Sequence, residues 1–182
     1  MNHRTLALAL AALFAGAGCG GSTSPGATKP VRFTASLTTG GEIGSTLAGN
    51  VAGSAGTFNA ELDTITGIFR YSMTFSNMSS AVAGANIHGP FAIGGGPTTA
   101  PAILDLDPTA ANTPLSSTAT FVKGTTTGTG GGILELAPST AISPTVSGDS
   151  LAQLLLAGKT YVNISTLLNG GGEVRGQLTI VP

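Results

Sequence analysis

The stretch KTYVNISTLLNGGGEVRGQLTIV, residues 159–181, is the most informative about the fold, because two segments of alternating apolar and polar residues flank a short glycine-rich loop. The loop spans residues 167–172 and ends in three glycines, a composition typical of a turn between antiparallel strands. Alternation places apolar side chains on one face, which must be buried. These side chains are Val162, Ile164, Val174, Leu178 and Ile180. The stretch therefore predicts a β-hairpin at the end of the domain.

The other face of the predicted hairpin is polar and carries Tyr161, Asn163, Ser165, Glu173, Arg175 and Gln177. Glu173 and Arg175 stand two residues apart on one strand face, near enough for a charge-assisted pair. Since only 8% of the residues are charged, we expect each of these charges to have a partner. Two alternatives stay open: an exposed ion pair, worth about 0–1 kcal/mol, or a buried polar network that fixes the strand register.

Upstream, strand-like segments alternate with glycine-rich breaks at residues 31–38, 56–63, 67–75, 83–89, 101–106 and 117–122. DTITG, residues 63–67, predicts a turn between two antiparallel strands. In the segment after it, Phe69, Tyr71, Met73 and Phe75 are expected to point to one side and the residues between them to the other, which predicts a strand with one buried face.

A single helix is predicted within SGDSLAQLLLAG, residues 147–158, with Ser147, Asp149 or Ser150 as its N-cap and Gly158 as its end. Residues 92–101 and 123–132 are rich in glycine and threonine and predict long surface loops. Because no crossover helices separate the strands, antiparallel pairing is favoured. We therefore predict an all-β antiparallel sandwich, or a barrel-like sandwich, with one short helix before the C-terminal hairpin.

Composition argues against nucleic acid as a partner. Beyond residue 18 the chain has six basic and eight acidic residues, and it has no tryptophan for base stacking. Neither a basic field nor a stacking platform is available.

The first residues, MNHRTLALALAALFAGAGC, predict an export signal over residues 1–18. Its apolar run is too short for a bilayer-spanning helix, which needs about 20 apolar residues. GAGC, residues 16–19, resembles the lipobox of bacterial lipoproteins, although Gly16 stands where leucine is usual. The alternative is an A-x-A site at Ala15–Ala17, whose cleavage would release a soluble, secreted protein beginning at Gly18.

Cys19 is the only cysteine of the chain, and a lone thiol at an exported N-terminus has no disulfide partner. Lipidation of Cys19 removes that hazard, and we expect it to anchor the protein in the outer membrane or at the cell surface. Residues 20–30 are rich in glycine, serine, threonine and proline and predict a flexible tether of about 17–20 Å. The predicted organisation is a signal peptide (1–18), a lipidated cysteine with its tether (19–30) and one β domain (31–182).

Three motifs, ANIHGP at 85–90, YVNIST at 161–166 and GGEVRGQL at 171–178, resemble the CHRD domain, named for chordin. The resemblance covers roughly residues 31–181 and implies a compact extracellular β domain without assigning an activity. CHRD domains commonly carry further histidines in the first two motifs. Here those positions hold Asn86 and Ser165, and His88 alone remains.

Alternation places Asn86 and His88 on one strand face, and our hypothesis gives His88 a structural role, hydrogen-bonded to Glu173 or Ser165. The expected polar cluster consists of Asn86, His88, Asn163, Ser165, Glu173 and Arg175. The alternative is a copper or zinc site that combines His88 with Asp105, Asp107 or Glu173. Such sites usually need three or four donors.

Catalytic motifs such as G-x-S-x-G and H-E-x-x-H are missing from the sequence. A hydrolase that assembles serine, histidine and aspartate from distant segments stays open. We therefore expect a non-enzymatic, lipid-anchored binding or scaffold module of the cell envelope. It would have no cofactor, and its ligand is not identified. A metal-binding envelope protein and a soluble secreted binding protein are the alternatives.

Overall fold

The computed structural model describes residues 29–42, 46–90, 100–109, 114–116, 118–136, 141–143 and 146–182. Within these ranges the strands are β1 (Val31–Thr38), β2 (Ala55–Leu62), β3 (Ile68–Ser76), β4 (Val82–His88), β5 (Ala102–Asp105), β6 (Thr120–Phe121), β7 (Gly128–Glu135), β8 (Ala141–Ser143), β9 (Val146–Ser147), β10 (Tyr161–Thr166), β11 (Val174–Gln177) and β12 (Thr179–Val181). The helices described are the 3-10 turn η1 (Thr39–Gly41) and α1 (Gly148–Leu156). The predicted export signal, Cys19 and almost all of the tether lie outside the described residues.

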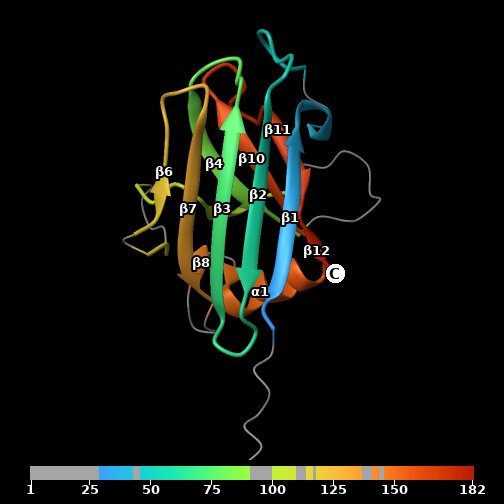
Figure 1. The fold of residues 1–182 in the computed structure, drawn as a ribbon, viewed down its shortest axis with the longest axis vertical. Coiled ribbons are helices and arrows are strands. Elements are labelled where there is room, and N and C mark those ends of the chain that lie inside the picture. Colours follow the sequence, from blue (N-terminus) through green and yellow to red (C-terminus); the bar gives the residue numbers. More distant parts are fainter. Residues whose placement is uncertain are drawn as a thin grey trace, which may run out of the picture.

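Ten of the strands form one antiparallel sheet in the order β5-β4-β10-β11-β1-β2-β3-β7-β6, and β12 also pairs with β1. The sheet curls into a half-barrel, so that β4 and β10 lie behind β2 and β3 (Figure 1). The buried apolar side chains of both halves form a single core between them. The predicted all-β antiparallel architecture with one short helix is confirmed.

The core follows from strict alternation along the strands. Phe69, Tyr71, Met73 and Phe75 of β3 are buried, as predicted, while the residues between them are exposed. The preceding turn also forms as predicted. The Asp63 carboxylate accepts hydrogen bonds from the amides of Ile65 (2.9 Å) and Thr66 (3.1 Å), which closes the turn between β2 and β3.

Helix α1 closes one end of the half-barrel (Figure 1). The Ser147 hydroxyl caps its first turn by accepting from the amide of Ser150, as one of the predicted caps. Leu151 and Leu155 are fully buried against the core. Gly158, which has a φ of 64°, ends the helix as predicted because this backbone conformation favours glycine.

The prediction of a surface loop over residues 123–132 was wrong in its second half, because β7 begins at Gly128. The glycines of β7 lie where large side chains of the neighbouring strand β3 fill the space that a Cβ would need. A Cβ on Gly130 would lie 3.0 Å from Met73 Cγ, and one on Gly132 would lie 3.0 Å from the Tyr71 ring. Glycine here permits close packing and does not signal a turn. The other predicted loop, residues 92–101, falls almost entirely outside the described residues.

The terminal hairpin forms, with Val162 opposite Gly176 and Ile164 opposite Val174. Its predicted apolar face holds through Leu178 but not at Ile180, which is 47% exposed. After Leu178 the chain leaves β10 and pairs with β1 as β12. Within the described residues β12 has β1 as its one neighbour, so one side of Ile180 stays uncovered.

Candidate functional site

Among the described residues, most of the buried polar side chains lie in the C-terminal hairpin. One group surrounds the carboxylate of Glu173, at the end of the half-barrel opposite α1, and we call it the Glu173 cluster: Ser54, Ser79, Thr166, Asn169 and Glu173. Ser54 precedes β2, Ser79 lies between β3 and β4, and Thr166 ends β10. The cluster therefore joins segments from both halves of the sheet.

Glu173 is fully buried, yet its carboxylate is well satisfied. It accepts from the Ser79 amide at 2.6 Å and from the Ser79 hydroxyl. It also accepts from Thr166 Oγ1 at 2.8 Å and from Asn169 Nδ2 at 2.9 Å. Ser54 Oγ, 2.8 Å away, shares one proton between Glu173 and the Asn77 carbonyl, which lies 2.7 Å from it.

These donors decide the protonation state. Burial of Glu173 favours its neutral form, but the hydrogen bonds from Ser79, Asn169 and Thr166 outweigh it and lower its pKa to about 2. A carboxylate with this pKa is a poor base near neutral pH, and its oxygens already have donors. The geometry gives Glu173 the role of holding loops together.

A second group is a stack of three side chains on neighbouring strands, which we call the aromatic stack: Arg175 of β11, Tyr161 of β10 and His88 of β4. The Arg175 guanidinium carbon lies 3.4 Å from the centre of the Tyr161 ring. The His88 ring lies parallel to Tyr161, with centroids 4.8 Å apart and planes 10° apart. This contact between cation and π-systems ties three strands together on one face of the sheet.

The Nδ1–H of His88 donates to the carbonyl of Ala100 at 2.8 Å, because a carbonyl oxygen can only accept. Burial lowers the pKa of His88, the bond to Ala100 opposes that shift, and Arg175 adds to it. The ring is therefore neutral at pH 7. The predicted partners of His88 were wrong. Glu173 lies in its own cluster, and Ser165 Oγ points to the Gly84 carbonyl at 3.4 Å.

The predicted pair of Glu173 and Arg175 does not form. Arg175 lies on β11 and Glu173 directly precedes that strand, but Glu173 turns into its cluster and Arg175 covers Tyr161. Both side chains are buried, so the exposed ion pair is excluded and the buried alternative holds for Glu173. Gly172, just before Glu173, has a φ of 134°, a backbone conformation that favours glycine.

A third arrangement lies on the other side of Gly172. Asn86, Asn163 and Arg175 stand opposite one another on β4, β10 and β11. Asn163 Nδ2 donates to the Gly171 carbonyl at 2.8 Å, and its Oδ1 is buried with no hydrogen-bond partner among the described residues. Glu42 Oε1 is also buried without such a partner in the described chain. A Cβ on Gly172 would lie within 2.5 Å of Glu42 Oε1 and against the Asn163 amide, so the two acceptors meet in one small space.

Glu42 has none of the donors that Glu173 has. Burial raises its pKa to about 6, although the Arg175 charge opposes the shift. The proton of a neutral Glu42 carboxyl is suited to satisfy an orphaned acceptor such as Asn163 Oδ1.

The carboxylates proposed as metal ligands are engaged elsewhere. Asp107 forms an ion pair with Lys123 and accepts from the Thr109 amide at 2.9 Å. Asp105 stands opposite Asn86 and accepts from the Asp107 amide at 2.9 Å. In the part of the chain that is described, three or more histidine, cysteine, aspartate or glutamate side chains nowhere gather as they would around a metal ion. Sites for zinc or copper usually need three or four donors.

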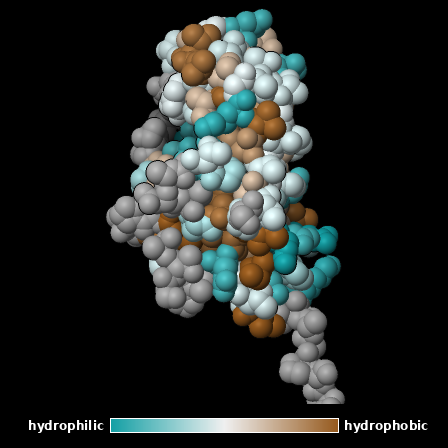
Figure 2. All heavy atoms as spheres, turned by 90° about the vertical axis from the view of Figure 1, so that its left-hand side faces the viewer, coloured by the Kyte–Doolittle hydropathy of each residue, from teal (hydrophilic) through white to brown (hydrophobic). Residues whose placement is uncertain are grey.

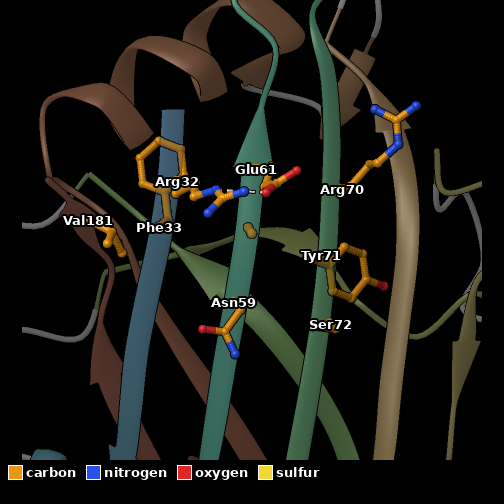
Figure 3. A pocket seen from close by; sticks show the side chains of 9 residues that line it. Arg32, Phe33, Asn59, Glu61, Arg70, Tyr71, Ser72 and Val181 are labelled. Atoms are coloured by element: carbon orange, nitrogen blue, oxygen red, sulfur yellow. Dashed lines mark ion pairs between the residues drawn. The ribbon is translucent and has the colours of Figure 1, made fainter. Parts of the chain in front are cut away.

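A shallow hollow of about 570 Å³ lies on the outer face of β1, β2 and β3. Figure 3 shows Arg32 and Glu61 pointing toward each other there, at 2.9 Å, while Arg70 extends away. The pair is solvent-exposed, where such contacts contribute about 0–1 kcal/mol. The lining of the hollow includes Glu61 and Ser72, and the Glu61 carboxylate is engaged by Arg32.

Sequence reasoning missed five residues of these sites: Glu42, Ser54, Ser79, Thr166 and Asn169. The first three lie more than 90 positions from their partners in the hairpin, and no local pattern reports such contacts. Thr166 and Asn169 lie within the C-terminal hairpin, next to its glycine-rich turn. Threonine and asparagine side chains often form hydrogen bonds in turns, and this was the signal that could have identified them.

The family model of the CHRD domain matches residues 33–178, which is most of the chain. The protein therefore belongs to the CHRD family, whose domains are typically extracellular and suggest a binding-type module. Neither the curated proteins nor the solved structures gave a match. Across the described residues, the helices are too short or too polar to cross a bilayer.

Proposed function

We propose that this protein is a lipid-anchored CHRD domain that acts as a non-enzymatic binding or scaffold module at the cell envelope. The observation that carries the non-enzymatic part is the Glu173 carboxylate. It is fully buried, its pKa is lowered to about 2, and neutral donors from Ser54, Ser79, Thr166 and Asn169 surround it. Such a group stabilises the fold and has no free lone pair directed at a substrate.

The aromatic stack supports the same conclusion. His88 is the one histidine of the described residues, and its ring packs against Tyr161 with Nδ1 held by a backbone carbonyl. A general base would need a nucleophile or a substrate proton within hydrogen-bond distance. The contacts of His88 with Tyr161 and the Ala100 carbonyl are instead those of a side chain that orders neighbouring strands.

The anchor rests on Cys19, the sole cysteine of the chain, which follows a short apolar export segment. Acyl chains contribute about 0.8 kcal/mol per buried CH₂, and two or three chains together hold a protein at a membrane stably. The tether then leaves the domain near that surface. This placement suits a module that binds or spaces other envelope components.

Two matched variants of the full chain test the anchor in a bacterial host. Cys19→Ala removes the acylated thiol, whereas Ala15→Lys disrupts the alternative A-x-A site and leaves residues 16–19 intact. We expect Cys19→Ala to leave the membrane fraction and to lose the mass of the lipid, and Ala15→Lys to keep both. Release of the wild-type protein without added lipid mass, blocked by Ala15→Lys, would establish the soluble secreted alternative.

A further inference from the structure

One end of the half-barrel holds both the start of the described chain and a group of exposed apolar side chains. β1 begins at Val31, opposite Leu62 at the end of β2. The turn after β2 therefore lies beside the point where the N-terminal tether joins the domain. In Figure 1 this turn, α1 and the C-terminus all lie at the lower end.

The turn presents Ile65 at its tip, 70% exposed, although isoleucine is usually buried. Leu156, at the end of α1, is 41% exposed. A hollow of about 360 Å³ lies between the turn and the helix, and both residues line it together with Leu62 and Leu136. Figure 2 shows hydrophobic atoms reaching the surface at this lower end.

Strand β12 adds to the same end. Val181 pairs with Arg32 at the beginning of β1, and Ile180 pairs with the next residue. Both side chains are partly exposed. Four of the exposed large apolar residues thus surround the place where the tether enters: Ile65, Leu156, Ile180 and Val181.

The charges at this end do not repel a neutral lipid surface. The Asp63 carboxylate is held by the amides of its own turn, and Glu61 pairs with Arg32. Asp149 also lines the hollow, and its carboxylate accepts from Gln153 Nε2 at 2.7 Å. Lys29 and Lys159, both exposed, flank the start of β1 and the end of α1. The balance of signs favours a zwitterionic surface over a strongly charged partner.

We propose that this end, with Ile65 at its tip, is a membrane-contacting surface that seats the domain on the bilayer. The proposal rests on the lipid anchor proposed above. A tether of eleven residues reaches about 17–20 Å on average, so the end from which it leaves stays close to the headgroups. A few apolar side chains bind a bilayer weakly on their own, but a tether raises their effective concentration enough to orient the domain.

The opposite end provides a matched control. Leu167, in the β10–β11 loop, is 75% exposed and is as apolar as Ile65. Because it lies at the far end of the half-barrel, a domain seated as proposed holds Leu167 away from the membrane. Apolar exposure alone would make the two positions equivalent, whereas the tether makes them different.

The test uses the full acylated chain in phosphatidylcholine vesicles, with and without phosphatidylglycerol. Ile65→Cys and Leu167→Cys each receive an environment-sensitive fluorophore, since the Cys19 thiol is already acylated. We expect the label at position 65 to shift its emission to shorter wavelength and to lose intensity to a quencher on the lipids. The label at position 167 stays unchanged. Hydrogen exchange of unlabelled protein provides a second readout, with protection on vesicles confined to residues 64–67, the end of α1 and β12.

Each outcome decides the matter. Protein that sediments with the vesicles while neither label responds overturns the seating surface and leaves the anchor intact. A response at position 167 instead of position 65 overturns it as well. Protein that carries no lipid and does not sediment overturns the anchor, and the seating surface with it.

Discussion

Glu173 and Glu42 lie on the two sides of Gly172, and they show how differently one residue type behaves when buried. Glu173 accepts from Ser79, Thr166 and Asn169, and its pKa falls to about 2. Glu42 has an orphaned buried oxygen next to the equally orphaned Asn163 Oδ1, and its pKa rises to about 6. Burial disfavours the charge of both, so the hydrogen-bond donors account for the difference. The number of hydrogen-bond donors therefore distinguishes Glu173, which stays ionised and holds loops together, from Glu42, which titrates near pH 6.

The largest expected effect comes from removing the better-satisfied carboxylate. Glu173→Ala leaves the donors of Ser79, Thr166 and Asn169 buried without an acceptor, and we expect a loss of about 3–5 kcal/mol in the free energy of unfolding. Chemical denaturation measures this loss. Glu61→Ala, which removes an exposed glutamate from its pair with Arg32, is the control and costs about 0–1 kcal/mol. Equal losses of unfolding free energy for the two variants would contradict the distinction between the buried, hydrogen-bonded Glu173 and the exposed Glu61.

Gly172 separates the two glutamates, and a side chain there disturbs both regions. Gly172→Ala places a Cβ within 2.5 Å of Glu42 Oε1 on a backbone with a φ of 134°. We expect a loss of about 2–3 kcal/mol from overpacking and backbone strain. Gly171→Ala meets nothing within 4 Å and serves as the control, with a change within about 0.5 kcal/mol. Thermal or denaturant unfolding of both variants measures the difference, and a neutral Gly172→Ala would contradict the close approach of Glu42.

His88 tests whether the structural role of the Glu173 cluster extends to the aromatic stack. His88→Ala removes the stacking on Tyr161 and the bond to Ala100, and we expect a loss of about 1–2 kcal/mol. Tyr161→Phe keeps the ring and serves as the control, with a smaller loss. Metal analysis of purified protein by mass spectrometry is expected to be the same for wild type and His88→Ala. Bound copper or zinc that disappears with His88 while stability is kept would support the metal-binding alternative.

The smallest expected effect is the pH dependence of stability, which differs in sign between Glu42 and Glu173. The folded-state pKa of Glu42 lies above its ordinary value of 4.5, so its contribution to stability is full below that pH and is lost as the pH rises through about 6. For Glu173 the sign is opposite, and its contribution is lost as the pH falls toward 2. Glu42→Gln cannot ionise and keeps a donor for Asn163 Oδ1.

We therefore expect Glu42→Gln to gain about 1 kcal/mol relative to wild type on going from below pH 4.5 to above pH 6, after allowance for solvent screening. Glu61→Gln is the matched control. Denaturation curves over this pH range provide the measurement, and parallel profiles for wild type and Glu42→Gln would show that Glu42 titrates normally.

Periodicity made much of the fold predictable. The alternation in β3, the turn at Asp63, the Ser147 cap and the C-terminal hairpin each depend on residues a few positions apart, and each formed as predicted. The strand β7 was missed because its glycines make room for Met73 and Tyr71 on the neighbouring strand β3. Composition alone reports such glycines as loop residues.

The site was less predictable for a related reason. Alternation placed Asn86 and His88 on one strand face, and their strand β4 pairs with β10 of the hairpin. The partner of His88 is a backbone carbonyl, which has no signature in the sequence. Ser54 and Ser79 are 119 and 94 positions away from Glu173 in the sequence. Local sequence patterns give no reason to predict these two serines as its partners.

The most direct test of the account is to titrate the side-chain carboxyl carbons of Glu42 and Glu173 by nuclear magnetic resonance. We predict two separate transitions, near pH 6 for Glu42 and near pH 2 for Glu173. If both carboxyls titrated together near their ordinary value of 4.5, the hydrogen-bond donors would not set the roles of the two residues. The structural reading of the hairpin would then be contradicted.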